Sequence, residues 1–504
     1  MVRVPLEAPT IQAGLDSLND GDTVWVARGP TYQEFLTALP IRFTMLGQFN
    51  DDSSALGLIE LNATNLPIDD TTAVLTLPPL ASATIENFSF RNEDRYGVRS
   101  RADSITLRNC RFESMSYGVR DVLDSIASVF TLDHCSFRSI AWYAVLTRPG
   151  NFLSATNCDF HGAGLDPGIP LVASNKMIID SCSFESNIGR TLLSASRGPH
   201  SITNCVFGSV DMDSPAPLVR LRHGIIRFAN NTFRNCTYYT HVLDINSNMG
   251  DSLEIVGNTF DRCRATSEGI MAFGVLTVET ATEGLERGAL IADNTFIECS
   301  GNRAVDDIVP SVYFPALITG NSFIRDSNNG LATIYAGNPV WQQTPLTLRN
   351  NVWDNCGYAF YLGATADARW NDWGEPTGPF HASYNPGGQG DTIDGPVPFI
   401  PWLGDTTSVV PSHPEVVSDL SVSVHPNPFN STVTIEYALT REQDVKLEIF
   451  DVLGRNVETI FDHRQTAGVH GVLWQANEFT SGVYFARLSS PLSNPQTVKL
   501  LLLK

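Results

Sequence analysis

The chain has 504 residues, of which 42% are hydrophobic and 17% charged, and its net charge is −21. This is the composition of a folded protein with room for more than one domain. The acidic excess argues against a nucleic-acid partner, because no basic stripe is present to displace counterions from phosphates. No window approaches the roughly 20 apolar residues of a membrane-spanning helix, so we expect no transmembrane segment.

The N-terminal residues 1–5 run almost directly into folded-looking sequence. No signal-peptide pattern of charged, apolar and small residues is visible there. A cytoplasmic protein and a chain whose true start lies upstream both fit this opening. The C-terminal segment described below favours the second.

A short pattern recurs through the next 280 residues: β-prone residues, then an Asn or a Cys, one spacer and an aromatic. It is first clear at Cys110 and Phe112, and successive aromatics are then 20 to 36 residues apart. The segments before the aromatics alternate with period two, and none carries an apolar stripe at helical spacing. We therefore predict a solenoid of stacked coils, each with two or three short strands. Later copies are Cys135/Phe137, Cys158/Phe160, Cys182/Phe184, Cys205/Phe207, Asn231/Phe233, Asn258/Phe260, Asn294/Phe296, Asn321/Phe323, Asn351/Trp353 and Asn371/Trp373.

Stacked coils place equivalent side chains above one another at about 4.8 Å. We expect the aromatics to fill the interior as a ladder. The Asn column fits a left-handed turn position, and its amides can also bond along the stack. Cys takes that place in the first coils, which indicates a buried column. We expect all nine cysteines to be buried free thiols, with disulfides or a metal as the alternatives. Loops inserted where the spacing is long are the places where binding or chemistry is expected.

Both ends of this region resemble a known group. The opening at residues 11–34 and the closing segments at residues 370–374, 385–388 and 398–403 are similar to those of secreted right-handed parallel β-helix proteins of the pectin-lyase-like kind. The resemblance covers about residues 3–404 and implies an all-β solenoid domain at residues 1–404. It also implies a short capping helix at residues 11–15, a turn at residues 19–22 and the first strand at residues 23–27. It does not fix an activity, because this fold hosts lyases, hydrolases, esterases and binding proteins.

The composition changes after Trp402. Residues 405–420 are rich in Thr, Ser, Pro and Val and predict a linker. Residues 421–504 then contain several short alternating segments, including 433–439, 445–449 and 483–488. Several short strands in about 85 residues predict a small immunoglobulin-like β-sandwich.

This last segment resembles the C-terminal sorting domain of the type IX secretion system of the Bacteroidetes. The resemblance implies a secreted or surface-attached protein that is recognised by the translocon and sorting machinery and is cleaved near the linker. The alternative is a generic immunoglobulin-like domain that acts as a spacer or adhesin. The matching motif residues are Pro426, Asn427, Pro428, Phe429, Gly454, Arg455, Gly468, Gly482, Tyr484, Lys499 and Lys504.

The sequence offers only weak candidates for chemistry. Arg99 and Arg120 follow similar Tyr-Gly-Val segments on adjacent coils, and Asp121 adjoins the second arginine. A lyase of this fold needs a base and acidic residues that hold calcium. The alternative is a solvated face of charges paired along the stack. Arg101, Asp103 and Asp124 lie nearby in the sequence.

Three further groups are weaker. Asp306 and Asp307 form an acid pair near the longest insertion. A second basic cluster contains Arg220, Arg222 and His223, and residues 387–391 faintly resemble a calcium-binding turn. His134 is expected to be a turn residue rather than a catalytic one. We assign no cofactor, and calcium is the only metal that the sequence suggests.

Two functions follow. The first is a glycan-binding or structural surface protein without catalysis, because no acid, base or metal cluster recurs on one face. The second is a polysaccharide lyase or glycoside hydrolase that acts on an acidic or plant-type polysaccharide. Two carboxylates beside an Arg or Lys in an aromatic-lined groove favour the enzyme, and an evenly charged face favours the binder.

Overall fold

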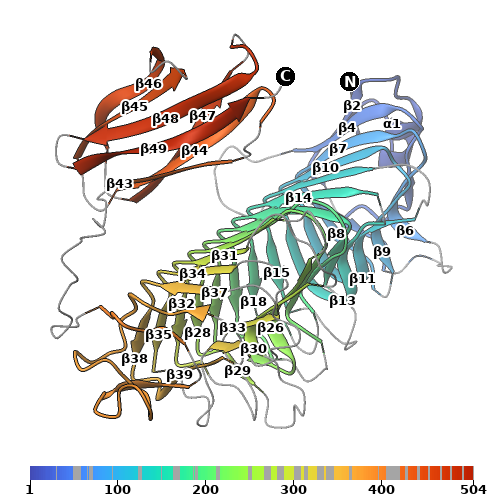
Figure 1. The fold of residues 1–504 in the computed structure, drawn as a ribbon. Coiled ribbons are helices and arrows are strands. Elements are labelled where there is room, and N and C mark those ends of the chain that lie inside the picture. Colours follow the sequence, from blue (N-terminus) through green and yellow to red (C-terminus); the bar gives the residue numbers. More distant parts are fainter. Residues whose placement is uncertain are drawn as a thin grey trace. The chain divides into compact units, whose positions relative to one another are not determined.

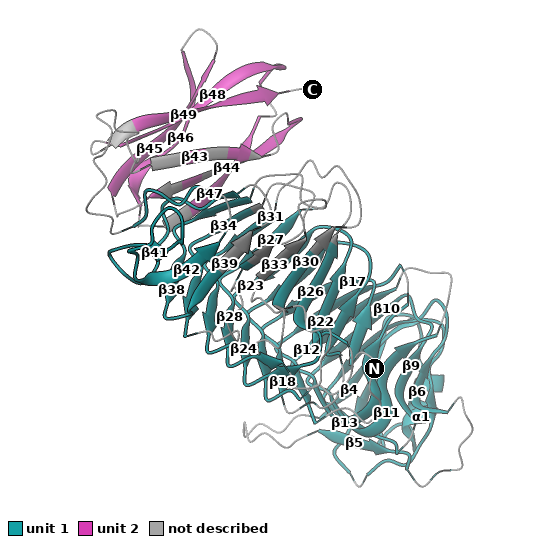
Figure 2. Ribbon diagram, turned by 60° about the horizontal axis from the view of Figure 1, so that its bottom comes forward, with its two compact units in different colours: residues 1–406 teal, residues 407–504 magenta. Residues whose placement is uncertain are grey.

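The computed structural model describes most of the chain. The residues described are 1–29, 31–48, 58–64, 66, 72–93, 95–122, 128–148, 150–162, 171–185, 187, 191–211, 216–247, 252–265, 274–280, 289–299, 308–311, 316–325, 334–336, 346–362, 366–394, 397–403, 420–425, 429–439, 443–451, 455–465, 468–476, 479–490 and 493–502. They divide into two compact units, residues 1–406 and 407–504 (Figure 2). The predicted linker falls outside the described residues except for Leu420.

The first unit is a right-handed parallel β-helix, as the repeat and the resemblance predict (Figure 1). Its first sheet is a stack of 15 parallel strands, one per coil. In order these are β1 (Val2–Val4), β2 (Asp22–Val26), β4 (Arg42–Gly47), β7 (Ser82–Glu86), β10 (Ser104–Arg108), β12 (Val129–Asp133), β14 (Phe152–Thr156), β17 (Lys176–Asp180), β20 (His200–Thr203), β23 (Ile226–Ala229), β27 (Leu253–Val256), β31 (Ala289–Ala292), β34 (Ala316–Thr319), β37 (Leu346–Arg349) and β40 (Ala366–Asp367).

The second stack carries the aromatic of each repeat. Its strands are β5 (Ile59–Asn62), β8 (Phe88–Arg91), the first halves of β11 (Arg111–Asp121) and β13 (Ser136–Leu146), β15 (Asp159–His161), β18 (Ser183–Glu185), β21 (Val206–Gly208), β24 (Thr232–Arg234), β28 (Thr259–Asp261), β32 (Thr295–Ile297), β35 (Ser322–Ile324) and β38 (Val352–Asp354).

The third stack contains the second halves of β11 and β13, which run through the corner between the two stacks. Its other strands are β3 (Leu36–Thr37), β6 (Ala73–Leu77), β9 (Tyr96–Ser100), β16 (Val172–Ser174), β19 (Leu193–Ala195), β22 (Val219–Arg222), β26 (His241–Ser247), β30 (Gly274–Thr280), β33 (Ile308–Ser311), β36 (Ile334–Ala336), β39 (Tyr358–Leu362), β41 (Pro379–Phe380) and β42 (Gly390–Asp394). A separate pair joins β25 (Thr237–Tyr238) to β29 (Arg264–Ala265).

Helix α1 (Ile11–Asp16) closes the N-terminal end of the solenoid core. The Thr10 side chain caps it by accepting a hydrogen bond from the Ala13 N–H at 3.1 Å. Ile11 and Leu15 are buried against the first coils, and a Cβ on Gly14 would come within 2.8 Å of Val24. The short capping helix predicted at residues 11–15 is therefore confirmed.

The aromatic ladder is confirmed through twelve coils. Neighbouring rings from Phe90 to Trp373 stack with centroids 4.4 to 5.2 Å apart, and each ring is essentially inaccessible to solvent. The separation matches the strand spacing of about 4.8 Å, so each ring lies over the one before it. Each buried Phe contributes on the order of 1.5–3 kcal/mol.

The column two places before the aromatics is also buried and continuous. The Asn294 Oδ1 accepts hydrogen bonds from the N–H and the Nδ2 of Asn258, both at 2.9 Å, and the Asn294 Nδ2 donates to the Asn321 Oδ1 at 2.9 Å. The expected bonding along the stack is therefore confirmed. The turn conformation expected for these Asn residues is wrong. The left-handed residue stands one place earlier, as at Asn230, Asp293 and Asn350.

The nine cysteines are buried and free, as predicted. Those in the first coils occupy the same column as the later Asn residues, and the Cys158 N–H donates to the Cys182 Sγ at 3.4 Å. His134 has a left-handed backbone at the turn before Cys135, which confirms its expected position.

The second unit contains two antiparallel sheets, which is consistent with the predicted small β-sandwich. One sheet has the order β43 (Leu420–His425), β44 (Thr432–Leu439) and β47 (Gly468–Gln475). The other has the order β46 (Asn456–Gln465), β45 (Gln443–Asp451), β48 (Gly482–Ser490) and β49 (Ser493–Leu502). Their facing side chains form a separate core that includes Val433, Leu447 and Trp474.

Candidate functional site: an aromatic strip with two arginines

Three neighbouring coils present a strip of aromatic rings on the outer face of the third stack. Tyr96 of β9, Tyr117 of β11 and Tyr143 of β13 are in register. The rings of Tyr96 and Tyr117 stack with centroids 4.7 Å apart, and those of Tyr117 and Tyr143 with centroids 5.8 Å apart. The strip therefore continues along the solenoid axis over three rungs.

A β-bulge adds a fourth ring to this strip. Between the pairs Met115–Ile140 and Tyr117–Tyr143, β13 has one residue more than β11. Such a bulge bends the strand and redirects side chains. Trp142 is 44% exposed here, and its ring centroid lies 5.6 Å from that of Tyr117. This indole is the most accessible large apolar group of the strip.

At Gly97 and Gly118 the backbone beside the strip has room only for glycine. A Cβ on Gly97 would lie 2.8 Å from the Gly118 carbonyl oxygen and 2.8 Å from the Phe112 ring. A Cβ on Gly118 would lie 2.5 Å from the Ala144 carbonyl oxygen. The Tyr-Gly-Val-Arg segments therefore pack their glycines against the aromatic ladder while Tyr and Arg point outward.

Arg120 is held against two of the tyrosines. Its Nη1 donates to the Tyr96 hydroxyl at 2.7 Å, and its Cζ lies 4.5 Å from the centroid of the Tyr117 ring. This cation–π geometry orients the guanidinium over the strip. Burial raises the pKa of Tyr117, and the positive charge of Arg120 partly offsets that rise. Tyr117 is therefore a neutral phenol at physiological pH.

Arg99 lies in register with Arg120 on the preceding coil, as the sequence predicts. Neither arginine forms an ion pair with another residue of the described chain. Many arginines elsewhere on the solenoid are paired with a carboxylate of a neighbouring coil, as in Arg108–Glu86, Arg138–Asp159, Arg220–Asp244, Arg227–Glu254, Arg325–Glu298 and Arg349–Asp367. The two in-register cations of the strip have no such partner among the described residues.

The structure does not bring the predicted carboxylates to these arginines. Asp121 follows Arg120 on an extended strand, so its side chain points to the opposite face, where it is 1% exposed and accepts a hydrogen bond from Asn151. Asp103 lies at the start of β10, in the first stack rather than the third. Asp124 lies outside the described residues. The hypothesis of an arginine–carboxylate cluster at this place is therefore wrong for Asp121.

The second basic cluster lies on the outer face of β22 and at the turn that follows it. Arg220 pairs with Asp244 of the next coil at 3.4 Å, and Arg222 is exposed. His223 has a left-handed backbone at the end of β22, which makes it a turn residue. His241 lies beside Asp244 and Arg220, and burial lowers its pKa to about 4. The Arg220–Asp244 pair neutralises its own two charges.

The remaining predicted residues are an acid pair and a Gly-rich turn. Asp306 and Asp307 lie outside the described residues. In the segment that faintly resembles a calcium turn, Asp391 is buried and accepts hydrogen bonds from the N–H groups of Cys356 and Gly357 at 3.0 and 2.6 Å. Within the described parts of the chain, no three His, Cys, Asp or Glu side chains are grouped so that they could hold a metal ion.

Trp142 and Tyr143 are the functional candidates that the sequence analysis missed. The segment Trp142-Tyr143-Ala144-Val145 stands where the two preceding coils have Tyr-Gly-Val. An alignment of three coils instead of two shows the aromatic pair Trp142-Tyr143 beside the tyrosines of the preceding coils. The extra residue of the bulge displaces this pair by one position in such an alignment. The exposure of the indole follows from that displacement.

The described sorting-motif residues of the second unit form its core and one of its turns. Phe429 and Tyr484 pack on Trp474 with ring centroids 5.7 Å away in each case. The Asp451 carboxylate accepts hydrogen bonds from the N–H and the Nε of Arg455 at 3.0 and 2.7 Å, which closes the turn between β45 and β46. Gly468 and Gly482 begin β47 and β48, and Lys499 lies exposed in β49. Pro426, Asn427, Pro428, Gly454 and Lys504 lie outside the described residues.

Comparison with known families matches each unit separately. Residues 80–225 match the family described as a right handed beta helix region. Residues 423–503 match the family described as a secretion system C-terminal sorting domain. The protein is an exported β-helix protein with a type IX sorting domain.

The sorting domain places this exported β-helix protein at the cell surface or in the medium and assigns its handling to the type IX machinery. No curated protein matches the chain. In the described part of the exported β-helix protein, no helix has the length and apolar character needed to cross a membrane. The β-helix match identifies a fold and leaves the ligand or reaction to be argued from the site.

Proposed function

We propose that the β-helix binds an extended anionic glycan along the strip formed by Tyr96, Tyr117, Trp142 and Tyr143, without cleaving it. The observation that carries this proposal is the pair of unpaired arginines, Arg99 and Arg120, beside a row of stacked rings. The exposed indole of Trp142 can pack on the apolar face of a ligand ring, while the tyrosines, whose faces stack on one another, present their edges. The arginines supply the charge-assisted hydrogen bonds that carboxylate or sulfate groups accept.

The local charge supports an anionic ligand. Residues 91–148 contain nine arginines and seven acidic residues, although the whole chain carries a net charge of −21. A cationic region on an otherwise acidic protein concentrates anions at that region. The strip runs along the solenoid axis, so a polymer can contact several rungs at the same time.

A polysaccharide lyase or glycoside hydrolase is less well supported. Hydrolysis normally needs two carboxyl groups on either side of the scissile bond. Among the predicted carboxylates that the structure describes here, Asp121 is buried on the opposite face of its strand. A purely structural role is also less well supported, because it gives no reason for an exposed indole and two unpaired arginines.

The test is a panel of neutral, carboxylated and sulfated polysaccharides, with binding measured by calorimetry and chain cleavage measured by size and by unsaturated-uronate absorbance. We expect binding to one acidic polymer, weakening with salt because dissolved ions screen the attraction between the arginines and the ligand charges. Trp142→Ala and Arg120→Ala should each weaken it about tenfold, or about 1.4 kcal/mol. Trp370→Ala is the matched control, since Trp370 is 38% exposed in another part of the β-helix.

Two results would contradict the proposal. The first is equal binding of the parent protein and the Trp142→Ala variant. The second is cleavage of a polymer that Arg120→Ala abolishes, because such cleavage would make the protein a lyase or hydrolase.

A further inference from the structure

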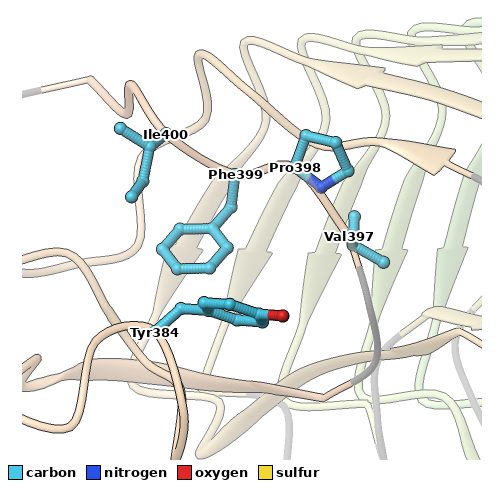
Figure 3. Close-up of a pocket in the computed structure, with 5 residues that line it drawn as sticks. All are labelled: Tyr384, Val397, Pro398, Phe399 and Ile400. Carbon is cyan, nitrogen blue, oxygen red and sulfur yellow. The ribbon is translucent and has the colours of Figure 1, made fainter.

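A separate pocket lies at the C-terminal end of the β-helix. It has a volume of about 310 Å³ and is lined by Tyr384, Val397, Pro398, Phe399 and Ile400 (Figure 3). This volume is at the lower end of the range for small-molecule sites, about 300–1,000 Å³. The pocket therefore has room for a single ring rather than for an extended ligand.

The walls of this pocket come from two segments, residues 397–400 and the loop that carries Tyr384. Residues 397–403 run beside the end of the first stack, where the Ala368 N–H donates to the Pro398 carbonyl oxygen at 2.8 Å and the Trp370 N–H donates to the Pro401 carbonyl oxygen at 2.7 Å. Phe399 is 3% exposed and forms the inner wall. Tyr384, from the loop after β41, forms the outer wall and is 66% exposed.

The turn that carries Tyr384 is fixed by hydrogen bonds. His381 and Asn385 exchange backbone hydrogen bonds of 3.2 and 3.0 Å. The His381 Nδ1 accepts hydrogen bonds from the N–H groups of Ser383 and Tyr384, both at 3.1 Å. The His381 ring also contacts the rings of Tyr384 and Phe399, with centroids 4.8 and 5.6 Å away. An exposed ring on a turn tied in this way is preorganised, which lowers the entropy lost on binding.

The chemistry of the walls selects the ligand. The lining residues carry no charge, and the phenol of Tyr384 is their only polar side-chain group. A charged ligand would lose its hydration here without gaining a partner. Aromatic walls favour another aromatic ring through offset or edge-to-face packing. The many hydroxyl groups of a sugar would find few partners among Val397, Pro398 and Ile400.

We propose that this pocket binds one neutral aromatic ring, packed against Phe399 and covered by Tyr384. The pocket is independent of the aromatic strip, since the pocket lies on other coils and shares no residue with the strip. The experiment uses the full-length chain and saturation-transfer NMR with three probes of similar size. These are p-cresol as the neutral aromatic, benzoate as its charged counterpart and methyl glucoside as a sugar ring.

We expect saturation transfer to p-cresol and at least fivefold weaker binding of benzoate and methyl glucoside. Tyr384→Ala and Ile400→Ala should each weaken p-cresol binding at least fivefold, and both side chains are exposed enough for the fold to survive. Phe380→Ala is the control, because Phe380 is 39% exposed at the same end of the β-helix but does not line the pocket. Absence of p-cresol binding, binding unchanged in both pocket variants, or equal binding of benzoate or methyl glucoside would overturn the proposal.

Discussion

The backbone N–H of Cys205 donates a hydrogen bond to the Oδ1 of Asn231 at 2.9 Å. This contact is the point at which the inner column of the β-helix changes from thiols to amides. On the N-terminal side the column is held by buried sulfur atoms, as in the bond from the Cys158 N–H to the Cys182 Sγ. On the C-terminal side each amide joins two coils through its Oδ1 and its Nδ2. The two halves of the solenoid therefore use different chemistry for the same packing position.

Replacing an amide inside the ladder should destabilise the β-helix. Asn294→Ala removes the acceptor of the Asn258 N–H and Nδ2 and the donor to the Ile255 carbonyl oxygen. Each buried polar group left without a partner costs about 1–3 kcal/mol, so we expect a loss of about 3–5 kcal/mol. Urea unfolding followed by circular dichroism measures it.

The matched variant is Asn294→Cys, which places at position 294 the cysteine that the first coils carry in this column. A thiol is a weak donor and acceptor, so the loss should be smaller than for alanine. An alanine variant as stable as the parent would show that the ladder contributes packing but no net hydrogen-bond energy.

Gly118→Ala should disturb both the core and the aromatic strip. The new Cβ would lie 2.5 Å from the Ala144 carbonyl oxygen and 2.8 Å from the Phe137 ring, and neither can move without shifting the ladder. Overpacking of this kind costs about 1–3 kcal/mol. Thermal unfolding should show a lower midpoint. Gly387→Ala should remain within about 0.5 kcal/mol of the parent, because a Cβ at Gly387 meets no atom within 4 Å. Equal effects of the two substitutions would contradict this packing argument.

His241 should make the β-helix sensitive to acid. Burial lowers its pKa from 6.5 to about 4, although Asp244 acts in the opposite direction and Arg220 in the same one. Between pH 6.5 and 4 the unfolded chain binds a proton that the folded chain does not, so stability falls as the pH falls through this window. The full effect is about 3 kcal/mol, since one pKa unit corresponds to about 1.4 kcal/mol.

The measurement compares urea unfolding at pH 7.5 and pH 4.5 for the parent and for His241→Gln. The variant should lose less stability between the two pH values than the parent does. The same loss in both proteins would assign the acid sensitivity to other groups.

Export should depend on the aromatic core of the second unit. Trp474 is 1% exposed between Phe429 and Tyr484, and its Nε1 donates to the Glu458 carboxylate at 2.8 Å. Loss of a buried Trp costs about 3–5 kcal/mol, which is enough to unfold a small domain. Trp474→Ala should therefore retain the protein inside the cell, as should deletion of residues 421–504.

Mass spectrometry of cells and medium checks both changes. Leu473→Ala is the control, because Leu473 lies on the same strand and is 55% exposed. The same measurement tests the predicted cleavage, which should release a form that lacks the residues beyond about Ser418. Export of the Trp474→Ala variant at the parent level would mean that the sorting machinery does not require this core.

Much of the fold was predictable because a solenoid repeats its local pattern. The spacing of Phe112, Phe137 and Phe160 was enough to predict stacked coils with an internal aromatic ladder. The turn conformation was placed one residue too late, since Asn231 and Asn294 read equally well as turn residues and as buried residues. The structure gives the left-handed turn to the residue before each of them, where the backbone leaves the first stack.

The sequence alone determined the stacked columns of aromatic and of Cys or Asn side chains, because equivalent side chains one coil apart must lie above each other once the period is known. It also determined the sorting domain, whose motif residues are close enough along the chain to be recognised without a fold. Only the tertiary structure decided which side of a strand each charge occupies. In the structure Asp121 and Arg120 lie on opposite faces of their strand, a bulge exposes Trp142, and Tyr384 and Phe399 line the same pocket. Those outcomes depend on register and on contacts between distant segments, which no local pattern encodes.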